Sequence, residues 1–87
     1  MPDFTIVEQK FNSLLQAAST QLNSSELGEV RDFIRVGEYG LALETFIDIV
    51  VEERKQISSE IFDRCREIAE EMRMPVEVYE KMRKFIY

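Results

Sequence analysis

The sequence contains no histidine, no tryptophan and a single cysteine, Cys65, among its 87 residues. Because four Cys or His ligands cannot be assembled from one chain, a zinc site of that type is excluded. A Ser-His-Asp or Cys-His catalytic arrangement is excluded for the same reason, and one cysteine cannot form an intrachain disulfide. So little cysteine favours a reducing compartment, and we expect a cytoplasmic protein.

Long apolar runs and an excess of basic charge are also missing. Apolar runs reach only three residues, as in Ile49-Val50-Val51, whereas a membrane span needs roughly 20, so no membrane partner is expected. The opening MPDFTIVEQKF lacks the basic, apolar and small-residue regions of a signal peptide. The 17 Asp and Glu outnumber the 11 Lys and Arg, which gives a net charge of −6. Direct binding of nucleic acid needs a basic surface, so a cationic protein is the expected partner.

Apolar residues recur at spacings of three and four throughout the chain, which is typical of amphipathic helices. The sequence therefore predicts an all-α fold: one domain, residues 1–87, built as a compact bundle of four to five short helices. A first helix, capped by Asp3 or Thr5, would bury Val7, Phe11, Leu14, Leu15, Ala18 and Leu22. A second, capped by Ser25 and ended by Gly37, would carry Leu27, Val30, Phe33 and Ile34.

Three further helices follow in the prediction. The third runs from Tyr39 to about Glu53 and, after the short link Gly37-Glu38, lies beside the second. The fourth follows Ser58-Ser59 and has Arg73 in its last turn; its apolar face is Ile61, Phe62, Cys65, Ile68, Ala69 and Met72. Pro75 starts the fifth, which would carry Val78, Tyr79, Met82, Phe85 and Ile86. Cys65 is expected to be a small buried apolar residue.

The third predicted helix has an unusual distribution of charge. Its broad apolar arc leaves a narrow arc of Glu44, Asp48 and Glu52, and residues 38–53 contain five acids and no base. Like charges four residues apart destabilise a helix by about 0.2–0.5 kcal/mol per pair. Two interpretations stay open: a solvated face relieved by cations from neighbouring helices, or a docking surface for a basic partner. Tyr39 is either an interface anchor or a core residue with its hydroxyl at the rim.

Catalytic and metal-binding functions have little support in the sequence. A carboxyl group that acts as a general acid or base needs a desolvated pocket, whereas every acid here lies on a polar face. The line of Glu44, Asp48 and Glu52 is too straight to converge on a metal ion, and no calcium-loop motif is present. We therefore expect a protein that is not an enzyme and that needs no metal or other cofactor.

Residues 29–44, EVRDFIRVGEYGLALE, resemble the central signature of the MafI-type immunity proteins, and the similarity extends from Glu29 to Met74. These are small helical bacterial proteins that neutralise a cognate toxin. The resemblance implies an all-α fold and, as partner, the C-terminal domain of a polymorphic or contact-dependent toxin, often a basic nuclease. In this motif we expect Gly37 to close one helix, Gly40 to allow close approach of two helices, and Leu41, Ala42 and Leu43 to begin the core face.

The sequence thus predicts an immunity protein that blocks a basic toxin domain through an acidic surface. The candidate contact residues are Glu38, Tyr39, Glu44, Asp48 and Glu52. The alternative is a helical adaptor or regulatory module that binds a partner helix through an exposed apolar stripe around Tyr79, Met82 and Ile86. The sequence does not indicate the oligomeric state.

Overall fold

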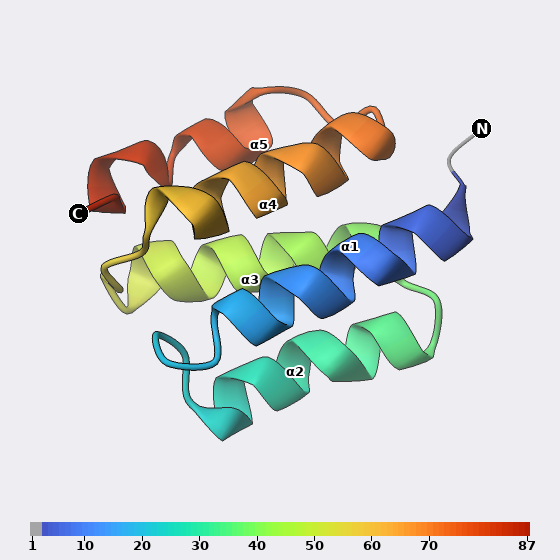
Figure 1. The fold of residues 1–87 in the computed structure, drawn as a ribbon, viewed down its shortest axis with the longest axis horizontal. Coiled ribbons are helices and arrows are strands. Elements are labelled where there is room, and N and C mark those ends of the chain that lie inside the picture. Colours follow the sequence, from blue (N-terminus) through green and yellow to red (C-terminus); the bar gives the residue numbers. More distant parts are fainter. Residues whose placement is uncertain (1–2) are drawn as a thin grey trace.

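A computed structural model describes residues 3–87, in which helices follow one another with short connections (Figure 1). The elements are α1 (Phe4–Ala17), α2 (Ser24–Arg35), α3 (Tyr39–Glu52), α4 (Ser59–Glu71), α5 (Glu77–Glu80) and a 3₁₀ turn (Arg83–Phe85). Successive helices run in opposite directions (Figure 1). The predicted all-α bundle of four to five short helices is confirmed. None of these helices is both long and apolar enough to cross a membrane.

The core forms where the apolar faces of the helices meet. α2 packs mainly against α3, and α1 packs mainly against α4. α3 contributes five buried residues, namely Ala42, Leu43, Phe46, Ile47 and Val50. Cys65 is fully buried in α4, and burial raises the pKa of its thiol, so it packs as the small apolar residue that was expected. Within residues 3–87 no polar or charged side chain is buried.

Side chains cap the first residues of three helices. Asp3 caps α1 by accepting hydrogen bonds from the backbone N–H groups of Thr5 and Ile6, at 3.0 and 3.3 Å, and Ser58 caps α4. The prediction that Ser25 caps α2 is wrong. Asn23 caps this helix instead, and its N–H donates to the Glu26 carboxylate in return. This reciprocal pair satisfies two backbone N–H groups at once, those of Asn23 and Glu26. Ser25 cannot take this role because it already lies within the first turn of the helix.

Three helices end in the same way, with one residue in the left-handed conformation. This residue is Gly37 after α2 (φ 78°), Arg54 after α3 (φ 52°) and Arg73 after α4 (φ 57°). The next N–H reaches back to the last turn in each case: Glu38 to Phe33, Lys55 to Val50, and Met74 to Ala69, at 2.9, 2.9 and 2.8 Å. Gly37 therefore ends α2 as predicted, whereas Arg73 lies beyond the last turn of α4 and not within it.

Arg54 and Arg73 occupy a backbone conformation that suits glycine much better than arginine. We expect Arg54→Gly and Arg73→Gly each to raise the free energy of unfolding by about 0.5–1 kcal/mol. Glycine removes the strain of a left-handed backbone from the folded state, and this gain exceeds the entropy that glycine adds to the unfolded chain. Urea unfolding followed by circular dichroism measures this change. Gly37→Ala is the matched control and should destabilise the protein. A lower unfolding midpoint for either arginine variant would contradict the prediction.

The fifth helix is shorter than predicted, and the chain then changes direction. α5 ends at Glu80, and Ile86 is extended and forms an isolated parallel bridge with Ile57. The Ile57 N–H donates to the Phe85 carbonyl, and the Tyr87 N–H donates to the Ile57 carbonyl, both at 3.0 Å. Because these bonds require an extended Ile86, one helix through residue 86 cannot form. α1 is shortened too: it ends at Ala17, although Leu22 remains buried in the following turn.

Candidate functional site

The outward face of α3 carries the predicted acidic stripe, which we define as Glu44, Asp48 and Glu52. All three side chains are exposed. Each lies one helical turn from the next, about 6 Å along the axis, on the side of α3 opposite its five buried residues. The apolar arc of α3 is what fixes the stripe outward, because any rotation that buried an acid would expose part of the core.

One cation from another part of the fold reaches the acidic stripe. The Lys81 ammonium lies 3.7 Å from the Asp48 carboxylate, with both side chains about half exposed. Elsewhere in residues 3–87 no Lys or Arg pairs with Glu44 or Glu52. The chain thus relieves the middle of the stripe and leaves its two ends unpaired.

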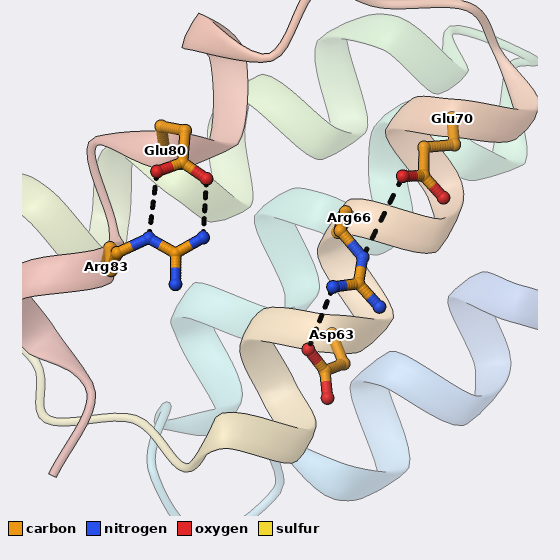
Figure 2. Close-up of polar contacts among 5 residues, drawn as sticks. All are labelled: Asp63, Arg66, Glu70, Glu80 and Arg83. Carbon is orange, nitrogen blue, oxygen red and sulfur yellow. Dashed lines mark hydrogen bonds and ion pairs between the residues drawn. The ribbon is translucent and has the colours of Figure 1, made fainter.

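Four acids of α4 and α5 are arranged differently, because arginines three or four residues away in the sequence pair with them. Arg66 lies between Asp63 and Glu70, at 3.5 and 3.9 Å (Figure 2). Arg83 forms a two-pronged contact with Glu80 at 2.7 and 2.8 Å (Figure 2), which lowers the pKa of the Glu80 carboxyl. α3 has no base of its own, so Glu44 and Glu52 remain available to a cation from outside the chain.

Tyr39 joins α3 to α1 and is half-buried. Its ring stacks on Phe4, with 5.2 Å between ring centroids, and lies 6.4 Å from Phe11. Its hydroxyl donates a hydrogen bond to the Glu8 carboxylate, and this bond raises the pKa of Tyr39. The structure therefore places Tyr39 between α1 and α3, with part of its surface at the rim of the core.

Glu38 precedes the first turn of α3 and is exposed. Its side chain makes no capping hydrogen bond, although its backbone N–H closes the end of α2. Gly40 follows in the first turn. The expectation that Gly40 permits close approach of two helices is wrong, because a methyl group built there would meet nothing within 4 Å. The start of α3 is therefore an open surface that bears one free carboxylate.

Sequence reasoning missed one residue of this surface. Leu41 was expected to begin the core face, yet it is 45% exposed. At about 100° per residue it lies on the same arc as the acidic stripe, between the directions of Glu44 and Glu52. The helical wheel that located the stripe already placed Leu41 on the outward arc. Leu41 was assigned to the core face only because its side chain is apolar.

The apolar stripe expected of an adaptor is not available on the surface. Tyr79 is 5% exposed and Met82 is fully buried. Ile86 is partly buried, and the residues on either side of it form backbone hydrogen bonds with Ile57. Tyr79 packs edge-on against Phe62, with 5.8 Å between centroids. The segment after Pro75 therefore completes the core, and removing it would expose the interior of the bundle.

The site as a whole is a convex acidic helix face with one exposed leucine. In the part of the chain that the structure describes, no group of three or more His, Cys, Asp or Glu side chains is placed to hold a metal ion. The geometry offers charge and an apolar contact for recognition of another molecule. Comparisons of the chain with protein-family models, with curated proteins and with solved structures found no match.

Proposed function

We propose that this protein is an immunity protein that binds a cognate bacterial toxin domain, a basic nuclease, and prevents it from acting on its substrate. The observation that carries the proposal is the acidic stripe on α3, where Glu44 and Glu52 have no cationic partner within residues 3–87. The signature resemblance in residues 29–44 supports the same function. Glu38 and the stripe would supply the charged contacts, and Tyr39 would hold α1 against α3 beside them.

The charge of the protein suits this role in two ways. A net charge of −6 attracts a basic domain over a distance and raises the rate of association. A nuclease binds nucleic acid through Lys and Arg side chains that neutralise phosphates. Carboxylates spaced along one exposed helix would compete for the same side chains. Inhibition would follow by occupation of the substrate surface, with no chemical step by the inhibitor.

Co-expression tests this proposal directly. The C-terminal domain encoded by the open reading frame immediately upstream should be basic and should arrest growth when expressed alone. Co-expression of this protein should relieve the arrest, and the two chains should purify as a complex. A neighbouring domain that is neither toxic nor bound would overturn the proposal. The helical adaptor would then move ahead, although its expected apolar stripe at Tyr79 and Met82 is buried.

A further inference from the structure

We propose that α3 enters a basic cleft of the toxin domain as a ridge, with Leu41 as the apolar anchor at one end. This inference rests on the proposed function and adds the shape and chemistry of the partner's binding site. That site would be a groove with a row of cationic side chains and an apolar pocket beside the end of the row. Leu41 would fill the pocket, and the acidic stripe would lie along the row.

The position of Leu41 is the first observation behind this assignment. α3 buries or half-buries every other large apolar side chain that it carries, from Leu43 to Val51. Leu41 alone of these lies on the outward arc, where it is 45% exposed. It is followed by Glu44, Asp48 and Glu52 on one continuous line about 16 Å long. An apolar residue in line with three acids makes this face chemically mixed, as the surfaces that meet in protein interfaces are.

The surroundings of Leu41 favour a concave partner. Gly40 precedes it and carries no side chain, and apart from its chain neighbours and its own helix backbone no atom lies within 4 Å of where a side chain would begin. Val36, in the turn before α3, is 70% exposed. Leu41 therefore projects from an uncrowded stretch of backbone, which a pocket can enclose. A flat partner would cover less of the leucine and would leave the ends of the acidic stripe in solvent.

The charge of the cleft follows from the contact that the chain already makes. Lys81 places its ammonium 3.7 Å from Asp48, so the stripe accepts a lysine side chain in the isolated protein. Both groups are about half exposed, and an exposed pair of this kind is weak. A cation of the partner can therefore replace Lys81 at Asp48, while two further cations meet Glu44 and Glu52.

The test is the affinity of Leu41→Ala for the purified toxin domain, measured by surface plasmon resonance at two salt concentrations. We expect Kd to rise about 5- to 30-fold, as for the loss of a partly buried leucine contact. The increase should lie in the dissociation rate, and the salt dependence should stay unchanged because no charge is altered. Leu41→Met, which keeps the apolar volume, should bind within a few-fold of the unaltered protein.

Val76→Ala is the matched control, since Val76 is 53% exposed but lies outside α3, and it should bind normally. Circular dichroism should show the same helix content for all variants. Normal binding by Leu41→Ala, with the unaltered protein binding tightly, would overturn the anchor and leave the proposed function standing. Equal weakening by Val76→Ala would also overturn the assignment to α3. If the unaltered protein fails to bind the domain, the proposed function and this inference fall together.

Discussion

Reversing the acidic stripe should slow association with the toxin domain by about 10- to 1,000-fold at low ionic strength. The variant is Glu44→Lys, Asp48→Lys and Glu52→Lys combined. The stripe supplies the local field that orients a basic partner before contact, and reversal turns attraction into repulsion. The salt dependence of the association rate should fall or change sign. The fold should persist, because all three side chains are exposed and the like-charge spacing along the helix is unchanged. Stopped-flow or plasmon resonance kinetics give the rate, and circular dichroism gives the helix content.

Two controls separate the position of the charge from its amount. Glu29→Lys, Glu70→Lys and Glu77→Lys combined changes the net charge equally at exposed positions outside α3, and it should slow association far less. Lys81→Gln should have the opposite effect and speed association, because it frees the Asp48 carboxylate from its ion pair with Lys81. If the stripe variant associates as fast as the unaltered protein, the contact residues are wrong, although an immunity function through another surface would remain open.

Phe46→Ala should remove most of the stability of the domain. Phe46 is fully buried in the middle of α3, and truncation of a buried phenylalanine costs about 3–5 kcal/mol. A domain of this size has a total stability near the lower end of about 5–15 kcal/mol. The variant should therefore be partly unfolded at 37 °C, and its melting temperature should fall by more than about 12 °C. Thermal melts followed at 222 nm measure the effect.

Leu41→Ala serves as the control for this loss of stability, because it removes a large apolar side chain from the outward face of the same helix. It should shift the melting temperature only slightly. Comparable destabilisation by both substitutions would show that Leu41 packs against the bundle and is not free for a partner. A small effect of Phe46→Ala would contradict the central position of α3 in the core.

The helices could be predicted from the sequence because each buries one periodic apolar face. Spacings such as Val7, Phe11 and Leu14 leave one orientation that buries most of the large apolar side chains of a helix. The ends were predicted less well. The end of α2 at Gly37 was predicted because glycine favours the left-handed conformation. Arg54 and Arg73 adopt the same conformation although arginine does not favour it. Nothing in the sequence around Arg54 marks this conformation, and Pro75, two residues after Arg73, indicates only that α4 ends nearby.

The parts of the site that depend on distant residues could not be predicted. Asp48 meets Lys81 because α5 folds back beside α3, and Tyr39 meets Phe4 and Glu8 because α1 crosses the start of α3. Periodicity gives the direction of a side chain relative to its own helix and carries no information on which other helix lies opposite. The outward direction of the acidic stripe is a local property, and it was predicted correctly.

The pairing of α1 with α4 has a consequence for the order in which the chain folds during synthesis. α2 and α3 are neighbours in sequence and in space, so this hairpin can close as soon as it leaves the ribosome. α1 is made before this hairpin, yet its main packing surface on α4 is translated more than forty residues later. At about 5–20 residues per second, the apolar side of α1 waits several seconds for its partner. The apolar side of α1 is therefore exposed for longer during synthesis than the packed faces of α2 and α3.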